Sequence, residues 1–445
     1  MDLQIRNFGA IENADVKFDG LTVIAGENDT GKSTVGKLVF AVIKAISRYE
    51  QDLEVGKERN VRKLVEELYR KLRGIGSLQV RDDNRVVEKF LPRNFLNELR
   101  PFIINEFKYN KEAATSLFEV KEELIRGIDI HENEYPNNSN LLDYLNRIKL
   151  ELILEEKKEE VLKTALKKAL ISEFHLEFTP KNTKKKTAVK FNEGKRRIFE
   201  IIGVKDQVIE FDIYDEIPPF EDVTLIESPI FIQLYNTLQA AGTALSEKSY
   251  WFDIALHIKD LIKKIRESKA LTDNEFYSKL NLQIIKEIHS VIEGTWSFDD
   301  DKLDFIFTRN GSATRQNFRS INVASGIKSF GIIQLLLLAE ILNNRSLLII
   351  DEPETHLHPK WQVEYAKVIC LLVKHEIPVL LTSHSPYLIE ALRYYSKEYD
   401  IERFTNYYLA ERNENGLVDI ENVNDEMNRV FLKLSEPFQK LVWEA

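Results

Sequence analysis

The sequence predicts an α/β protein with a mixed sheet, an antiparallel β lobe and a mainly helical insertion. The first 25 residues alternate apolar and polar side chains as strands do. Continuous apolar runs at Leu347–Ile350 and Val379–Leu381 are typical of strands buried on both faces of a parallel sheet. Between residues 51 and 172, by contrast, Glu, Lys, Leu and Ile recur at helical spacing.

The predicted elements alternate along the chain, and glycine- or proline-containing turns separate many of them. The apolar stripe that begins after Pro136 predicts one helix from Asn140 to Ser172. In chain order, strands are expected at 3–5, 16–18 and 21–23, a helix at 32–48, strands at 173–179, 187–191, 197–202, 207–213 and 223–227, helices at about 249–267 and 273–293, strands at 298–309 and 316–323, a hairpin at 406–423 and a helix at 424–443.

Composition excludes several classes of protein. Hydrophobic residues make up 43% and charged residues 30% of the 445 positions, as in soluble globular proteins. The net charge of −10 argues against a chain that coats nucleic acid. One cysteine, Cys370, cannot build a disulfide framework. No signal peptide is recognisable, and the longest apolar run, Gly331–Leu342, is shorter than the ~20 residues that span a bilayer, so we expect a cytoplasmic protein without membrane contact.

A locally basic segment runs from Lys181 to Arg197. It holds eight Lys and Arg residues and one acid, Glu193. One interpretation is the solvated tip of a hairpin. The other is a contact with nucleic acid or an acidic partner.

The strongest motif is the segment from Gly26 to Ser33, which fits G-x-x-x-x-G-K-[ST] between an apolar strand and a helix. Its backbone N–H groups and the following helix N-terminus suit phosphate oxygens. Lys32 is expected at the β- and γ-phosphates and Ser33 at Mg²⁺. The nucleotide-binding residues predicted here are Gly26, Glu27, Asn28, Asp29, Thr30, Gly31, Lys32, Ser33 and Thr34.

Polar residues also follow the two apolar strands. Asp351 and Glu352 end the first strand, and because adjacent strand residues point to opposite faces, they can divide two tasks. We expect Asp351 to hold Mg²⁺ and Glu352 to orient or deprotonate the attacking water. His384 ends the second strand and can contact a γ-phosphate. Ser325 and Gly326 precede a helix, where a hydroxyl and unpaired N–H groups suit an anion.

In this order, the motifs resemble the head of ABC-type ATPases, which implies a P-loop NTPase fold. The segments Ile5–Ile11, Gly26–Asn28, Asp351–Pro359 and Thr382–Pro386 are similar to those of the RecF/SMC/Rad50 and OLD-like group. Within it, the chain looks most like the compact bacterial ATPases of the AAA15 or AAA21 type. These include the ATPase subunits of the Septu and PARIS anti-phage systems. The resemblance covers residues 1–48 and 220–410.

The resemblance implies a homodimer or higher homo-oligomer in which two heads enclose ATP. Ser325 and Gly326 would contact the γ-phosphate bound to the partner, and Glu354–His358 would lie near the dimer seam. Gln233 is the candidate for the family's Q-loop residue and, with Ser33 and Asp351, for a ligand of Mg²⁺. The segment from Ala324 to Lys328 departs from the usual Leu-Ser-Gly-Gly-Gln because its second glycine is missing.

From the resemblance we expect three parts: the start of the ATPase head at 1–50, a helical insertion for dimerisation or partner binding at 51–172, and the rest of the head at 173–445. The insertion is shorter than an SMC arm, and no nuclease module is apparent. The leading hypothesis is an ATPase that acts as sensor or regulator for a separately encoded nuclease or toxin in anti-phage defence. The alternatives are a RecF-like DNA-binding ATPase in repair and, less favoured, a nuclease.

Overall fold

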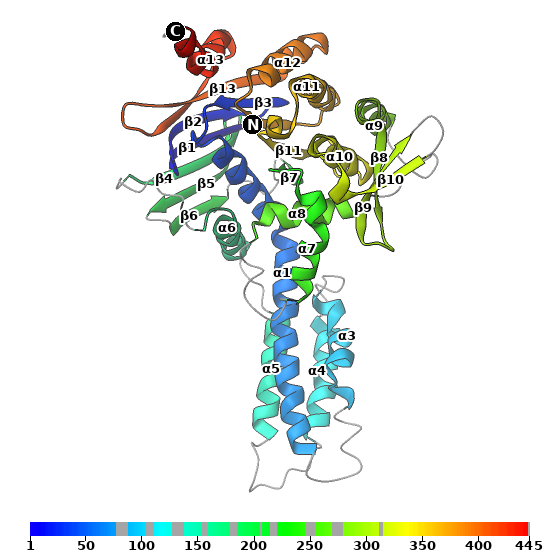
Figure 1. The fold of residues 1–445 in the computed structure, drawn as a ribbon. Helices are drawn as coiled ribbons and strands as arrows, with labels where there is room; N and C mark the ends of the chain where they lie inside the picture. The colour runs from blue at the N-terminus through cyan, green and yellow to red at the C-terminus, as the bar shows by residue number, and fades with distance from the viewer. Residues whose placement is uncertain are drawn as a thin grey trace. The chain divides into compact units, whose positions relative to one another are not determined.

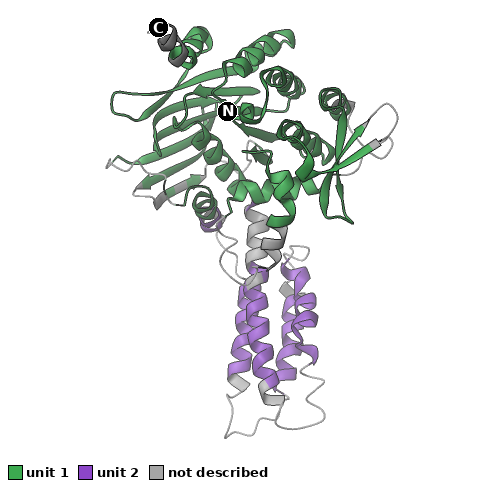
Figure 2. Cartoon of the chain, viewed as in Figure 1, with its two compact units in different colours: residues 1–47, 166–445 green, residues 48–165 purple. Residues whose placement is uncertain are grey.

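In a computed structural model, the chain forms two compact units (Figure 2). The first unit contains residues 1–47 and 166–445, and the second contains residues 48–165. In the part of the chain that the structure describes, none of the helices combines the length and the apolar composition that a membrane span requires. The structure describes residues 1–76, 88–103, 111–126, 138–153, 158–175, 177, 185–204, 207–213, 220–244, 254–268, 279–310 and 315–443.

The first unit is built on an 11-stranded mixed sheet, in the order β6-β5-β4-β1-β2-β14-β13-β3-β12-β11-β7 (Figure 1). Its strands are β1 (Asp2–Phe8), β2 (Ile11–Lys17), β3 (Leu21–Gly26), β4 (Thr187–Glu193), β5 (Arg196–Val204), β6 (Gln207–Ile213), β7 (Asp222–Ile226), β11 (Ser346–Asp351), β12 (Val379–Ser383), β13 (Thr405–Arg412) and β14 (Val418–Asn422). The prediction of an α/β fold with a mixed sheet and an antiparallel lobe is confirmed.

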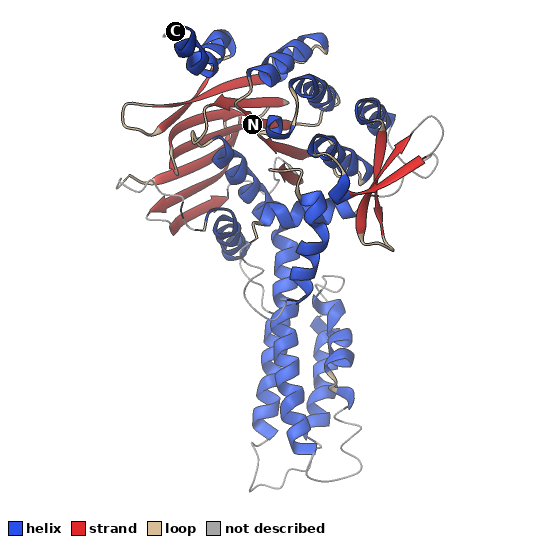
Figure 3. Ribbon diagram, viewed as in Figure 1, coloured by secondary structure: helices blue, strands red, loops and turns tan. Residues whose placement is uncertain are grey.

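The strands β7, β11, β12, β3 and β13 run parallel to one another. Every residue of β3 and of β12 is buried, as expected for strands covered on both faces. Helices lie beside these strands (Figure 3), and α-helices and strands alternate along the chain between residues 325 and 412. The helices of the unit are the start of α1 (Lys32–Gly76), the end of α6 (Lys158–Phe174), α7 (Phe231–Ala244), α8 (Leu256–Arg266), α9 (Lys279–Ile292), α10 (Ser325–Leu338), α11 (Pro359–Lys374), α12 (Pro386–Glu398) and α13 (Met427–Trp443).

A separate antiparallel sheet has the order β10-β9-β8. It consists of β8 (Gly294–Asp299), β9 (Asp304–Asn310) and β10 (Arg315–Arg319). Its Trp296 lies so close to α10 that a Cβ added at Gly331 would be 2.4 Å from the indole Nε1. Only a residue without a side chain allows this approach.

The second unit contains the continuation of α1 with α3 (Pro92–Ile103), α4 (Lys111–Arg126) and α5 (Asn138–Ile153). These helices pack around their own hydrophobic cluster, which includes Leu68, Leu99, Phe118 and Leu145. Each amphipathic helix buries its apolar stripe in this cluster.

Several predicted elements differ from the structure. The strand expected at 298–309 is two strands, β8 and β9, connected by residues 300–303. The strand expected at 316–323 ends at Arg319, before a short 3-10 helix, Ser320–Asn322. The helix expected to end at Arg48 continues to Gly76. Within the helix expected from Asn140 to Ser172, the structure describes α5 and α6, and residues 154–157 lie outside the described residues. Apolar residues of α5 join the cluster of the second unit, and those of α6 do not. Glu173 and Phe174 were predicted to begin a strand but end α6, and most of the remainder, to residue 179, lies outside the described residues.

Three buried charges, Lys44, Asp260 and Lys264, and the half-buried Asp222 connect α1, α8 and the start of β7. Lys44 Nζ lies 2.5 Å from Asp222 Oδ1 and 2.7 Å from Asp260 Oδ1. Lys264 Nζ lies 2.6 Å from Asp222 Oδ2 and 2.9 Å from Asp260 Oδ2. Each ammonium therefore has two carboxylate partners, which offset the cost of removing its charge from water.

Removal of one charge from this network should destabilise the first unit. The variant Asp260→Asn leaves two buried ammonium groups with one carboxylate, and we expect a loss of roughly 3 kcal/mol in the free energy of unfolding. Urea denaturation measures it. The control Glu390→Gln breaks an exposed pair with Arg393 and should cost less than about 0.5 kcal/mol. Equal losses of unfolding free energy in the two variants would contradict a stabilising role of this network.

Candidate functional site

The phosphate loop connects β3 to α1, and β3 lies between β13 and β12 in the sheet. Thr30 Oγ1 and Lys32 Nζ each donate to the carbonyl oxygen of Glu27 at 2.7 Å, so the loop closes on itself. A Cβ at Gly26 would lie 2.7 Å from the carbonyl oxygen of Ala410, which explains the need for glycine there. The structure thus gives Gly26–Ser33 the compact form that a phosphate cradle requires.

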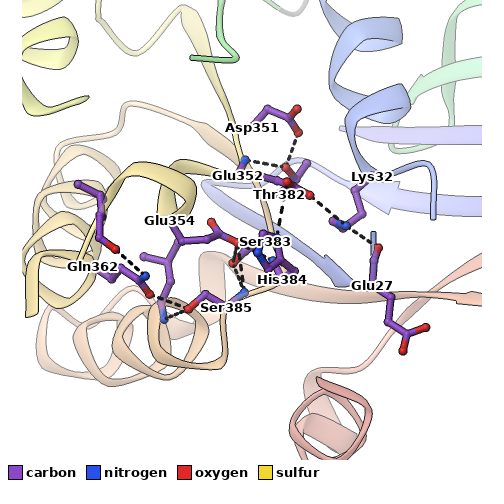
Figure 4. Close-up of polar contacts among 12 residues, drawn as sticks. Glu27, Lys32, Asp351, Glu352, Glu354, Gln362, Thr382, Ser383, His384 and Ser385 are labelled. Carbon is purple, nitrogen blue, oxygen red and sulfur yellow. Dashed lines mark hydrogen bonds and ion pairs between the residues drawn. The ribbon is translucent and has the colours of Figure 1, made fainter. Parts of the chain in front are cut away.

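The predicted catalytic residues converge on this loop (Figure 4). The parallel register pairs Asp351 of β11 with Thr382 of β12, so Glu352 and His384 follow two neighbouring strand ends. Glu352 Oε1 lies 3.3 Å from Lys32 Nζ, and Glu352 Oε2 lies 3.5 Å from His384 Nδ1. The structure therefore brings Lys32, Glu352 and His384 together.

Electrostatic interactions within this trio favour the charged forms of Glu352 and His384. The interaction with His384 lowers the pKa of Glu352 to about 2, and Lys32 adds to the effect against the opposing effect of burial. The same interaction raises the pKa of His384. Glu352 also adopts a left-handed backbone conformation with φ of 43°, which is uncommon for a residue other than glycine.

A group of oxygen atoms surrounds Asp351. Thr382 Oγ1 donates to Asp351 Oδ1 at 2.5 Å. Burial raises the pKa of Asp351, and the nearby carboxylates of Glu352 and Glu227 raise it further. Against this increase, the hydroxyls of Thr382 and Ser33 both lower the pKa of Asp351. Hydroxyl and carboxylate oxygens are the ligands that Mg²⁺ prefers, and a cation would relieve the excess of negative charge. Ser33 and Asp351 therefore fit a magnesium site.

Gln233, the third predicted metal ligand, has a different partner. Its Oε1 accepts a hydrogen bond from Lys328 Nζ on α10. The carboxylate nearest in strand register to Asp351 is instead Glu227, because Ile226 pairs with Ile350 one residue earlier. The role of Gln233 at a metal remains a prediction.

The predicted signature residues lie at the start of α10. Ser325 is exposed, and Gly326 packs so tightly that an added Cβ would be 2.9 Å from the ring of Trp361. Within the described part of the chain, no hydrogen bond or ion pair connects Ser325 or Gly326 to the phosphate loop of the same chain. The free N–H groups of the α10 N-terminus thus remain available to an anion.

Glu354 has a role at the site that the sequence did not indicate. Its buried Oε1 accepts hydrogen bonds from Ser383 Oγ at 2.8 Å, from the His384 N–H at 2.6 Å and from the Ser385 N–H at 3.1 Å. Ser385 Oγ in turn donates to Gln362 Oε1 at 2.6 Å. Glu354 therefore fixes the segment that carries His384.

Arg412 is a second residue that sequence reasoning missed. It ends β13, and its Nη2 donates to Asp29 at both the carbonyl oxygen, 2.7 Å away, and Oδ2, 2.5 Å away. Its Nη1 donates to the carbonyl oxygen of Gly416 at 3.1 Å. Asp29 has φ of 61°, a left-handed backbone conformation that is energetically unfavourable for residues other than glycine. Arg412 holds the loop in this conformation.

The basic segment has acidic partners in its described part. Lys185 pairs with Glu12 at 2.6 Å, and Lys190 and Arg197 both pair with Glu200, at 2.9 and 2.7 Å. Lys181 and Lys184 lie outside the described residues. The paired cations reduce the positive charge that this segment offers to nucleic acid.

A strand, a phosphate loop and a helix beside an acidic strand end define a P-loop ATPase. The sequence profile of the AAA_15 family, described as an AAA ATPase domain, matches residues 1–389, and the chain belongs to this family. The predictions of an ATPase and of AAA15 membership are thereby confirmed.

A curated relative is the Septu protein PtuA of Bacillus thuringiensis, 30% identical over 140 residues, which are 27% of this chain and 33% of the relative. The chain thus matches about a third of that relative's length.

Three solved structures of SMC heads also match the chain. The first is an SMC head bound to the C-winged helix domain of ScpA, with a TM-score of 0.42 and 10% identity over 96% of this chain and 98% of the other. The second is the SMC head domain from Thermotoga maritima, with a TM-score of 0.34 and 11% identity over 95% of this chain and 98% of the other. The third is an SMC head domain with an extended coiled coil bound to the C-terminal domain of ScpA derived from Pyrococcus furiosus, with a TM-score of 0.38 and 11% identity over 97% of this chain and 98% of the other. At these TM-scores they add nothing to the assignment.

The role of Arg412 can be tested by glycine rescue. We expect Arg412→Ala to weaken ATP binding about fivefold, or roughly 1 kcal/mol, because Asp29 loses the contact that offsets its strained backbone. Asp29→Gly in the same chain should restore affinity to within about twofold, since glycine adopts this conformation without strain. Titration with a fluorescent ATP analogue measures both. If the double variant binds as weakly as Arg412→Ala, the arginine acts by another route.

Proposed function

We propose that this protein binds ATP with Mg²⁺ and hydrolyses it, and that the nucleotide controls the pairing of two copies. The observation that carries the proposal is the position of the Glu352 carboxylate, 3.3 Å from Lys32 Nζ of the phosphate loop and 3.5 Å from His384 Nδ1. Binding groups, a candidate base and a candidate phosphate contact thus meet at one edge of the sheet.

The chemistry follows from the charges of this trio. Without nucleotide, Lys32 and His384 hold Glu352 ionised and attract its carboxylate. When ATP binds, Lys32 turns to the phosphate oxygens, and the negative phosphates raise the pKa of Glu352 towards the range of a useful base. Glu352 then takes a proton from the attacking water, and His384 donates a hydrogen bond to the γ-phosphate. Mg²⁺ at Ser33 and Asp351 supplies charge neutralisation when bound.

The exposed signature residues support the pairing of two copies. An ATP-bound loop presents negative charge, and the N-terminus of α10 with Ser325 offers unpaired N–H groups and a positive dipole end. In a head-to-head pair, the α10 N-terminus of one copy would complete the site of the other. ATP then favours the paired state because ATP binds more tightly to the pair than to the single copy, and hydrolysis of the ATP lets the two copies separate.

We further propose that the paired state acts on a separately encoded effector, a nuclease or toxin, in anti-phage defence. Membership of the AAA_15 family and the similarity to the Septu protein PtuA support this proposal. The internal pairing of Lys185, Lys190 and Arg197 makes the RecF-like alternative the weaker one.

Two variants should separate binding from hydrolysis. Lys32→Ala removes the ammonium that faces the phosphates, so we expect loss of ATP binding. Glu352→Gln keeps the shape but removes the base, so it should bind ATP and hydrolyse it at least ~100-fold more slowly. Equilibrium binding and phosphate release are the measurements, with Glu390→Gln as a surface control. The reverse pattern would refute the assigned roles.

Glu352→Gln should also trap the paired state. With ATP, light scattering should show twice the monomer mass, and Ser325→Arg should prevent this association because it blocks the α10 N-terminus. An unchanged mass with ATP would exclude nucleotide-controlled pairing.

Purification of Glu352→Gln from its host with ATP, followed by mass spectrometry, tests the effector. A stoichiometric small protein is expected. Nucleic acid without such a protein would favour the repair-like function.

A further inference from the structure

A buried histidine lies between two carboxylates near the site. His257, at the start of α8, is 1% exposed. Its Nδ1 lies 2.7 Å from Glu173 Oε2, and its Nε2 lies 2.9 Å from Glu227 Oε2. The backbone N–H of His257 also donates to Glu173 Oε1 at 3.0 Å. Burial disfavours the positive charge of the His257 imidazolium, but the carboxylates of Glu173 and Glu227 raise the pKa of His257. In the protonated form, both ring nitrogens donate hydrogen bonds to these carboxylates.

Glu227 connects this histidine to the candidate active site. It follows β7 directly, and the pairing of Ile226 with Ile350 places it beside Asp351 at the same sheet edge. Its other oxygen, Oε1, lies 2.8 Å from Lys37 Nζ on α1, one helical turn after Ser33. His257 and then Lys37 lower the pKa of Glu227 to about 2. Glu227 is therefore a fixed anion whose charge reaches Asp351.

The helices that hold Glu227 have a particular place in the chain. Lys37 belongs to α1, which continues into residues 48–76, and Glu173 belongs to α6, which begins at Lys158. The chain leaves the first unit along α1 and re-enters it along α6. The Glu227 carboxylate is thus held directly by one of them and through His257 by the other.

We propose that His257 is a positioning residue that, supported by Glu173, holds the Glu227 carboxylate beside Asp351 and thereby sets the divalent-cation affinity and turnover of the site. A carboxylate that two cations fix in place orients the water molecules around a cation at Asp351, whereas a mobile one does not. The inference rests on the proposed ATPase function, and its effect falls on the cation and the chemical step rather than on the nucleotide itself.

The test compares His257→Gln and Glu173→Gln with Asp260→Asn. Asp260 is the matched control because it is buried, charged and on the same helix α8. Its partners Lys44 and Lys264 connect it to Asp222 at the opposite end of β7. We expect His257→Gln and Glu173→Gln to lower kcat about tenfold, with unchanged ATP affinity in the absence of divalent cation. Asp260→Asn should lower the melting temperature but keep kcat within about twofold.

A second measurement does not need hydrolysis. In the Glu352→Gln background, Mn²⁺ binding in the presence of ATP is followed by electron paramagnetic resonance. His257→Gln should weaken Mn²⁺ about tenfold and Asp260→Asn should not.

If all three buried variants lose kcat and Mn²⁺ affinity to the same extent, or if His257→Gln loses neither, the proposal is wrong. If Glu173→Gln behaves as wild type while His257→Gln does not, the support from α6 is wrong. Should His257→Gln fail to fold, Glu173→Gln decides the outcome alone, since it keeps the side-chain size. Failure of the proposed function is recognised separately, because the otherwise unaltered protein and Lys32→Ala would then release phosphate at the same rate.

Discussion

The parallel register of β3, β12, β11 and β7 is the constraint on which the rest of the structure depends. Because these strands run the same way, their carboxyl ends meet at one edge, and each end delivers a polar residue there. Parallel strands of this kind are covered by helices on both faces of the sheet, and this burial explains their apolar composition. A shift of one residue would turn the strand-end side chains to the opposite faces and disperse the site.

Charges gathered at such an edge need partners, and the structure supplies them in pairs. Lys32 and His384 compensate Glu352, and Lys37 and His257 compensate Glu227. Asp351 has hydroxyl donors beside it but lies among carboxylates. This imbalance is local, and it is the electrostatic reason to expect the cation there.

The sequence predicted the parts of the site that are local in the chain. Lys32 and Ser33 belong to one loop motif, and Glu352 and His384 follow apolar strands. Arg412 and His257 were not predicted because their contacts join residues 383, 84 and 30 positions apart, with no spacing rule to mark them. For the same reason periodicity could not show that apolar residues of α5 join the cluster of the second unit while those of α6 do not, because both segments carry apolar residues and the cluster they enter depends on tertiary packing.

The left-handed backbone of Glu352 has a consequence for the evolution of the chain. Such a conformation costs a non-glycine residue of order 1–3 kcal/mol, and glycine or asparagine at this position would relieve most of the strain. Selection for a more stable fold therefore opposes selection for the carboxylate. With the role proposed for Glu352, members of the family that no longer hydrolyse ATP would be expected to carry one of those smaller residues at this position.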